Sequence, residues 1–412
     1  MTGTTQGSAP VVESRSSAAP HVVVAPDSFK GSLAAIDVAA ALAAGVRDAV
    51  PDARVTCLPM ADGGEGTLEA LLGVWGVEAH GLATVDAIGR PTTARWAVSP
   101  DGTVGVVELA EASGLPRVVD APPRPLGAHT RGTGELAAAV LDAGVAEVLV
   151  CLGGSASTDG GAGLLTGLGA RVLDAAGAPV PDGGAGLAQA AALDLAGLHP
   201  RARQVRWRVA VDVTNPLVGD LGAAAVFGPQ KGATPADVAA LDAALGGWAD
   251  LLERTTGVRT HDLPGAGAAG GVPAALVAVL GAGLERGADL VADFVGLPAA
   301  LADAALVLTG EGSFDSQSVR GKVADGVARR AAAAPARPPV VVVAGRVLLP
   351  AAEARAAGVT AAFSIAPGPV ALDELLERTA ERLRETAAHV TALTLARDPG
   401  DSRRTGPDRA SV

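Results

Sequence analysis

Residues 148–173 read VLVCLGGSASTDGGAGLLTGLGARVL, in which an apolar run passes through a segment of Gly, Ser and Thr into a second apolar run. We expect a strand over residues 148–152, a glycine-rich turn, and a helix over residues 164–173. A strand that leads through a short turn into a helix is the building unit of a parallel sheet. This stretch predicts an α/β fold.

Four other strand-like runs end in similar clusters of small and polar residues. They cover residues 22–25, 208–213, 306–308 and 340–343. In open α/β sheets, ligands bind beyond the carboxyl ends of the strands, where loop amides and helix N-termini can receive anions. Five such ends in one chain indicate a shared cleft.

The length of 412 residues exceeds that at which a single core usually stops growing, so we expect two domains. Between residues 73 and 131 the pattern changes to strands and turns, which indicates a different kind of element there. Residues 1–20 lack the basic start and apolar block of a secretory signal, and we expect a disordered leader. Residues 396–412 are polar and are expected to form a disordered tail.

Composition argues against several partners. The net charge is −12, whereas nucleic acids and anionic membranes attract clustered Lys and Arg. The longest nearly apolar stretch, residues 270–284, is broken by Gly and Pro and is shorter than the roughly 18 residues that a membrane-spanning helix needs. Cys57 and Cys151 lie in strand-like runs, so we expect two buried thiols and a cytoplasmic protein.

The turn after residue 152 carries Gly153, Gly154 and Ser155 ahead of the predicted helix. Successive amides in such a segment can form a nest that binds phosphate. The alternative is an ordinary capped turn with Asp159 as the N-cap. The density of glycine and hydroxyl residues favours phosphate binding.

A second cluster, Asp62, Gly63, Gly64 and Glu65, follows a strand predicted over residues 55–59. Two carboxylates beside flexible glycines suit a metal ion or the hydroxyls of a substrate, and Asp62 is the candidate metal ligand. An acidic N-cap with Glu three residues later is also a capping box, which is the structural alternative.

A third cluster contains Asp27, Ser28 and Lys30 and follows the first predicted strand. Lys30 could meet a phosphate or the carboxylate of a substrate. We therefore include all three among the candidate site residues.

The fourth cluster begins with Asp212 inside an otherwise apolar run. A buried Asp is costly unless it is paired or takes part in the chemistry, so Asp212 is a candidate base or metal ligand. The alternative is an Asp that caps a neighbouring loop. Asn215 and Lys231, which follow it, are candidate ligands of the substrate or of a phosphate.

The fifth cluster brings acids and cations to one strand end. Its candidates are Gly310, Glu311, Gly312, Asp315 and Lys322. Such a mixture suits a site that holds a metal–nucleotide complex, although any one of the charges could instead be a solvated surface group.

Several motifs of nucleotide-binding and zinc-binding sites are absent or lie in an unsuitable sequence context. Residues 265–270 match GxGxxG, but no strand is predicted before them, so a dinucleotide site is not expected. There is no Walker A run, and the six His residues lack the spacing of zinc ligands.

Seven motifs occur in order along the chain: APDSFKGS, ADGGEGT, GGSASTDGGAG, DVTNPLVGDLGA, FGPQKGA, PGAGAAGG and TGEGSFDSQSVRGK. In this combination the chain resembles the bacterial glycerate kinase family over residues 22–390. The resemblance implies an ATP-dependent kinase that uses Mg²⁺ and phosphorylates D-glycerate, at the 2-hydroxyl, to give 2-phosphoglycerate. It also implies a Rossmann-like or flavodoxin-like parallel-sheet domain from residues 21–75 and 288–395, with a second α/β domain inserted over residues 76–287 and the site in the cleft between them.

We hypothesise that Asp212 orients the glycerate hydroxyl, that Lys30 and Lys322 balance the phosphate charge, and that Asp62 or Asp315 holds Mg²⁺. Asp212, Lys30 and Asp315 are thus the catalytic candidates. The rival interpretations are a kinase that gives 3-phosphoglycerate or acts on another small hydroxy acid or polyol, and a non-catalytic protein that binds nucleotides or carboxylates. Assembly into a homo-oligomer stays open.

Overall fold

Strand β1 (His21–Val24) lies inside a five-stranded parallel sheet in the computed structural model of the protein, which describes residues 19–395. Its neighbours are β2 (Arg54–Cys57) and β11 (Leu306–Phe314), and the sheet continues through β12 (Val340–Val347) to β13 (Ala361–Ser364). The sheet therefore combines two strands from the start of the chain with three from its end. We call this sheet and its helices the end lobe.

Alternating side chains of β1 point to the two faces of this sheet. Val22 and Val24 pack in one core with Leu42 of α1 (Ala35–Ala49) and Leu383 of α14 (Thr379–Leu395), whereas Val23 packs in another core. That other core holds side chains of α9 (Gly287–Phe294), α10 (Leu297–Ala300) and α11 (Val323–Ala333). The remaining helices of the end lobe are α12 (Ala351–Ala356) and α13 (Leu372–Glu377). Helices thus cover both faces, because the sheet is apolar on both.

A second sheet has six strands in the order β10-β9-β6-β5-β4-β3. These are β3 (His80–Val85), β4 (Pro91–Val98), β5 (Val104–Glu108), β6 (Glu147–Cys151), β9 (Arg206–Ala210) and β10 (Gly283–Glu285). The pairs β3–β4 and β4–β5 are antiparallel and the others are parallel, so the strand-and-turn pattern after residue 73 marks the antiparallel edge. Two short strands, β7 (Arg171–Leu173) and β8 (Ala192–Asp194), pair antiparallel in a separate small sheet.

The helices around the second sheet complete what we call the middle lobe. They are α3 (Ala110–Ser113), α4 (Arg131–Asp142), α5 (Ala162–Gly167), α6 (Ala223–Phe227), α7 (Pro235–Thr256) and α8 (Val272–Leu280). Within residues 19–395, short 3-10 turns link the larger elements of both lobes: η1 (Leu115–Val118), η2 (Gly184–Gln189), η3 (Pro229–Lys231), η4 (Ala268–Gly270) and η5 (Leu301–Asp303).

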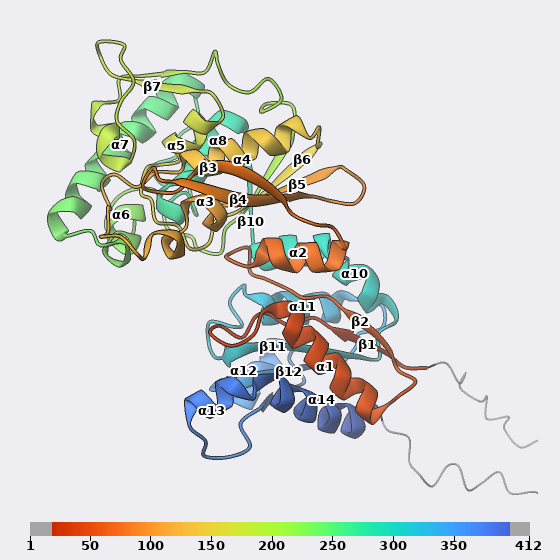
Figure 1. The fold of residues 1–412 in the computed structure, drawn as a ribbon. Coiled ribbons are helices and arrows are strands. Elements are labelled where there is room, and N and C mark those ends of the chain that lie inside the picture. The colour runs from red at the N-terminus through yellow and green to blue at the C-terminus, as the bar shows by residue number, and fades with distance from the viewer. Residues whose placement is uncertain (1–18, 396–412) are drawn as a thin grey trace, which may run out of the picture.

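Helix α2 (Thr67–Trp75) lies between the two lobes (Figure 1). Its Leu68 and Leu71 belong to a core that contains Val23 of the end lobe and Leu149 of the middle lobe. The two lobes therefore share apolar packing around α2. The chain enters the six-stranded sheet after α2 and leaves it after β10, and we keep a domain division at residues 75/76 and 287/288 as a proposal.

The predicted α/β fold with a parallel sheet is confirmed, but several element boundaries were wrong. Residues 164–173 do not form one helix: α5 ends at Gly167, Gly169 has a φ of +98°, and residues 171–173 form β7. A residue other than glycine would be strained at that φ, so the chain turns there. Residues 211–213 lie beyond the end of β9, whereas β11 continues six residues past Leu308 because it stays paired with β12.

Neither cysteine forms a disulfide: Cys151 is buried as expected, but Cys57 is exposed because β2 is an edge strand. Among residues 19–395, no helix is both long enough and apolar enough to cross a membrane. The predicted tail, and the leader up to residue 18, lie outside the described residues.

Candidate active site

A cavity of about 410 Å³ opens where the ends of β6 and β9 meet the loop that follows β2. Eight of the predicted site residues line it: Asp62, Gly63, Gly64, Gly153, Gly154, Ser155, Asp212 and Lys231. These residues come from parts of the chain up to about 170 positions apart. The structure therefore brings the strand-end clusters together, as the parallel-sheet argument predicted.

Two glycines allow the loops of the two lobes to meet. The amide of Leu152 donates to the carbonyl of Gly63 at 3.2 Å, and a Cβ placed on Gly153 would lie 2.4 Å from the Cα of Gly64. Gly63 has a φ of +84°, and a Cβ there would lie 2.4 Å from that of Ala210. Glycine is required at these positions by close backbone approach, whatever ligand the loops bind.

Lys231 is the buried cation of the cavity. Only 3% of the residue is exposed, and its Nζ donates to Ser155 Oγ at 2.9 Å and to the carbonyl of Ser157. No carboxylate of residues 19–395 forms an ion pair with it. Burial lowers the pKa of Lys231 to about 8, against the opposing effect of the Asp159 charge.

Asp159 is completely buried in the loop behind Ser155. Its carboxylate accepts hydrogen bonds from the amide and hydroxyl of Thr130 at 2.8 Å each, and from the amides of Gly161 and Gly163 at 3.1 and 3.2 Å. The alternative of Asp159 as the N-cap was wrong, because the N-cap of α5 is Gly161, although Asp159 does accept from amides at the start of that helix. It fixes the loop whose other end, Gly153 to Ser155, lines the cavity.

Four acids from both lobes influence one another, and two of them, Asp62 and Asp212, line the cavity. Burial first, and then the charge of Asp62, raises the pKa of Asp27 to about 7, and the Glu311 charge adds to this effect. Burial and the Asp62 charge also raise the pKa of Asp212 and of Glu311 to about 7, with Lys322 opposing both shifts. The Asp62 charge thus acts on all three, and the Asp315 charge also raises the pKa of Glu311.

Asp212 connects the middle lobe to the acidic group. Its Oδ1 accepts a hydrogen bond from the amide of Gly287 at 2.8 Å, the position where the chain returns to the end lobe. The residue is solvent-accessible in the open cavity, although surrounding protein atoms desolvate its carboxyl. No donor within the described part of the chain reaches its other oxygen, which can therefore accept from a ligand.

The acidic group fits a metal ion that arrives with a nucleotide. No three His, Cys, Asp or Glu side chains of residues 19–395 form a ready-made metal cage. Mg²⁺ is usually bound through one or two carboxylates, with waters and substrate phosphates as its other ligands. Glu311 Oε1 is buried without a hydrogen-bond partner, which is consistent with a nearby cation. Asp62 lines the cavity, whereas Asp315 does not, and its Oδ1 accepts from the amide of Gln317 at 2.8 Å.

The remaining predicted residues lie outside the cavity lining. Asp27 accepts a hydrogen bond from the amide of Ser28 at 2.6 Å, Lys30 is exposed in the same turn, and Lys322 precedes α11. Asn215 donates to the carbonyl of Leu221 at 2.8 Å and so holds its own loop. Glu65 is exposed at the start of α2.

The interpretation of residues 310–312 as a loop was wrong, because they lie inside β11. Gly310 pairs with Val343 of β12, and its carbonyl accepts from the amide of Asp27 at 2.8 Å. A Cβ on Gly310 would lie 2.2 Å from the carbonyl oxygen of Val343. Gly310 thus serves strand packing, and contact of Gly310 and Gly312 with phosphate stays a prediction.

Sequence reasoning missed Glu108. This buried carboxylate accepts hydrogen bonds from the amides of Gly66 and Leu68 at 3.0 and 2.8 Å and thereby caps α2. The capping box that was the structural alternative for residues 62–65 is not formed. Burial raises the pKa of Glu108 to about 7, although both hydrogen bonds oppose this. Its position at the end of the apolar strand β5 was the signal that could have identified it.

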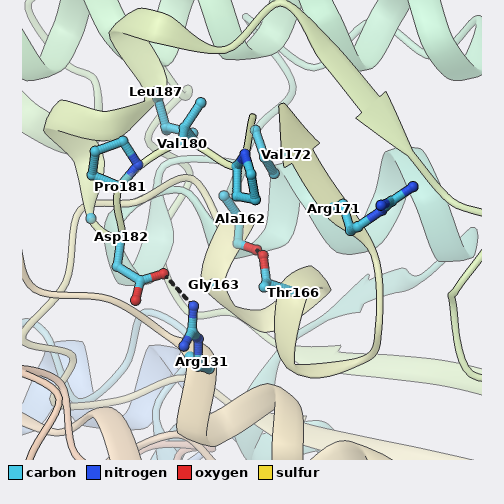
Figure 2. A pocket seen from close by; sticks show the side chains of 12 residues that line it. Arg131, Ala162, Gly163, Thr166, Arg171, Val172, Val180, Pro181, Asp182 and Leu187 are labelled. Carbon is cyan, nitrogen blue, oxygen red and sulfur yellow. Dashed lines mark hydrogen bonds and ion pairs between the residues drawn. The ribbon is translucent and has the colours of Figure 1, made fainter. Parts of the chain in front are cut away.

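A smaller cavity of about 240 Å³ lies in the middle lobe beside α5 (Figure 2). Arg131 and Asp182 form an ion pair of 2.9 Å at its wall, and Arg171, on the opposite side, pairs with Asp194. Both guanidinium groups thus have protein partners, so the larger cavity between the lobes is the candidate active site.

Comparisons with known proteins identify the family of this chain. A model of the glycerate kinase family matches residues 22–395. Glycerate kinase of Bacillus subtilis is 42% identical over 90% of this chain and 97% of its own length, and glycerate 2-kinase of Escherichia coli is 42% identical over 91% and 98%. A crystal structure of a protein assigned as glycerate kinase 2 from Salmonella typhimurium LT2 superposes with a TM-score of 0.83 at 44% identity, covering 91% of this chain and 98% of that one. The chain therefore belongs to the glycerate kinase family.

Proposed function

We propose that the protein is a kinase that transfers the γ-phosphoryl group of ATP to the 2-hydroxyl of D-glycerate and gives 2-phosphoglycerate. The family membership supports the reaction, and the name of the Escherichia coli relative supports the 2-hydroxyl. The observation that carries the proposal is the cavity between the lobes, which Asp212, Asp62 and Lys231 line together. Phosphoryl transfer needs such a combination of an orienting carboxylate, a metal-binding carboxylate and a cation.

Asp212 is suited to act on the hydroxyl that attacks. A carboxylate oxygen without a protein donor can accept the hydrogen bond of the hydroxyl and hold it in line with the phosphoryl group. Its pKa of about 7 lies close to neutral pH, which is where a general base works best. Because the phosphoryl transition state is loose, orientation contributes more than proton removal.

The cations and the metal ion would act on the phosphates. The charge of Lys322 lowers the pKa of Glu311 and of Asp212, which supports a role for Lys322 in balancing the charge of the phosphates. Lys30 is exposed in the turn after β1 and would meet the same phosphates. Asp62 would hold Mg²⁺, which when bound supplies positive charge to the phosphates. Asp315 stays the second candidate ligand.

A kinase that gives 3-phosphoglycerate, or that accepts another small hydroxy acid, is the second possibility, because the phosphate-binding groups do not choose the acceptor. We further propose that the protein is cytoplasmic, and we leave open whether it forms a homo-oligomer.

The test is turnover by the purified full chain with ATP, Mg²⁺ and D-glycerate. We expect ADP release that stops when EDTA removes the metal, with a product that enolase consumes directly. A product that enolase accepts only after a phosphoglycerate mutase would place the phosphate on the 3-hydroxyl. Absence of ADP release with D-glycerate would reject the proposed acceptor.

A further inference from the structure

The ammonium group of Lys231 has a hydrogen bond left to give. A lysine ammonium carries three N–H donors, and the structure uses two of them, on Ser155 Oγ and on the Ser157 carbonyl. The Ser155 hydroxyl accepts from Lys231, so its own proton is also available. Lys231 and Ser155 both line the cavity, and they therefore offer two neighbouring donors to a ligand.

The charge of Lys231 also lacks a carboxylate within ion-pair distance, because Asp159, whose charge raises the pKa of Lys231, forms no ion pair with it. The residue is 3% exposed and has no ion pair with any carboxylate of residues 19–395. A buried charge without a partner costs several kcal/mol in general, so natural proteins rarely keep one without a use. An anionic group on a bound ligand would supply the missing partner.

We propose that Lys231 and Ser155 bind the carboxylate of the acceptor, and that they thereby select hydroxy acids over uncharged polyols. This inference rests on the proposed function. Two donors side by side match the two oxygens of a carboxylate. A polyol would leave the ammonium without an anion, and a site built around a buried polar group rejects analogues that lack its partner.

The distribution of charge separates this subsite from that of the triphosphate. Asp27, Asp62 and Glu311, the groups that suit a metal ion, gather on the end-lobe side together with Lys322. A metal–triphosphate complex needs such carboxylates, whereas a single buried ammonium among glycine and serine neutralises a single negative charge. The donor therefore belongs on the end-lobe side and the acceptor carboxylate on the middle-lobe side.

The test compares Lys231→Met and Ser155→Ala with the wild-type chain by titration calorimetry with D-glycerate and by steady-state kinetics. Lys231→Met should weaken D-glycerate binding about 100-fold or more and Ser155→Ala about 10-fold, while the KM for ATP changes less than about 3-fold. Activity on glycerol relative to D-glycerate should rise in Lys231→Met. Arg254→Met, which removes an exposed charge from α7, is the matched control and should leave both substrates unaffected.

Two controls separate a folding defect from a loss of binding. Ser155→Ala keeps the charge of Lys231, and thermal unfolding of each variant measures its stability directly. A raised KM for ATP with unchanged glycerate binding would overturn the carboxylate assignment and leave the kinase proposal intact. Wild-type protein that neither binds nor phosphorylates D-glycerate would overturn both. Retained glycerate binding in Lys231→Met would overturn the inference alone.

Discussion

The two lobes bring opposite chemistry to the same cavity. On the end lobe, Asp27 and Glu311 are desolvated acids whose pKa values are raised to about 7. On the middle lobe, Lys231 is a desolvated cation whose pKa is lowered to about 8. Each half therefore holds its charged groups in an unfavourable state, which a ligand of opposite charge would relieve. This difference favours our proposal that the end lobe binds the metal ion with its nucleotide. The middle lobe would bind the anionic group of the acceptor, and phosphoryl transfer would take place between the two lobes.

Asp212 is the exception that joins the halves. It follows β9 of the middle lobe, yet its pKa responds to Asp62, and its carboxylate accepts from Gly287 at the return to the end lobe. Asp212 therefore lies where the proposed metal side and the proposed acceptor side meet. The following experiments test whether the two halves have these separate roles.

Removal of the charge at the junction should have the largest effect. Asp212→Asn keeps an oxygen that can accept from Gly287 but loses the carboxylate, so we expect kcat to fall about 100- to 10,000-fold with little change in stability. The measurement is ADP release at saturating ATP and D-glycerate. Asp220→Asn, on the exposed part of the same loop, is the control and should retain activity. An active Asp212→Asn would remove the orienting role.

Separating the two loops should have the next largest effect. The Cβ of Gly153→Ala would lie 2.4 Å from the Cα of Gly64, so the loops must move apart. We expect about a 100-fold loss of kcat/KM, and destabilisation by about 1–3 kcal/mol, because a displacement of roughly 1 Å is enough to misplace reacting groups. Gly246→Ala in α7 meets no atom within 4 Å and should instead stabilise by about 0.5–1 kcal/mol. Normal activity of Gly153→Ala would mean that the loops tolerate separation.

A smaller effect, on the KM for ATP, should distinguish the role of Lys322 in the end lobe from that of Lys231 in the middle lobe. Lys322→Met removes a charge beside Glu311, and we expect the KM for ATP to rise about 10-fold while the KM for D-glycerate stays constant. Arg355→Met, an exposed change in α12, should alter neither constant. A rise only in the KM for D-glycerate would reverse the roles assigned to the two lobes.

The smallest effect concerns stability and pH. The pKa of Glu311 is about 7 in the folded protein against an ordinary 4.5, so the folded state binds the extra proton and loses stability as pH rises through this window. Glu311→Gln should therefore be more stable than the wild type by about 1–3 kcal/mol at pH 8 and nearly equal to it at pH 5. Urea unfolding of the ligand-free protein at both pH values is the measurement. Destabilisation at pH 8 would show that the Glu311 carboxylate makes a favourable interaction in the folded state.

Local patterns were sufficient for the fold class and for much of the cavity lining. Each strand that ends in Gly, Ser or Asp can be recognised from its local sequence alone. Because parallel strands place their carboxyl ends at one edge of a sheet, Asp62, Gly153 and Asp212 were expected to be neighbours, and all three line the cavity. The same reasoning failed at residues 310–312, which look like a glycine-rich loop. Pairing with β12 holds them in a strand, and pairing is not a local property.

The sequence by itself determined that this chain is an α/β protein and, through seven ordered motifs, which family it resembles. Only the tertiary structure decided that β1 lies beside β11, that Glu108 caps α2, and that Lys231 is buried without an ion pair among residues 19–395. The reason is that the helix or strand propensity of a segment, and the spacing of its apolar residues, depend only on residues a few positions apart. Burial, hydrogen-bond partners and pKa depend instead on groups that are up to hundreds of positions away and become neighbours only in the folded chain.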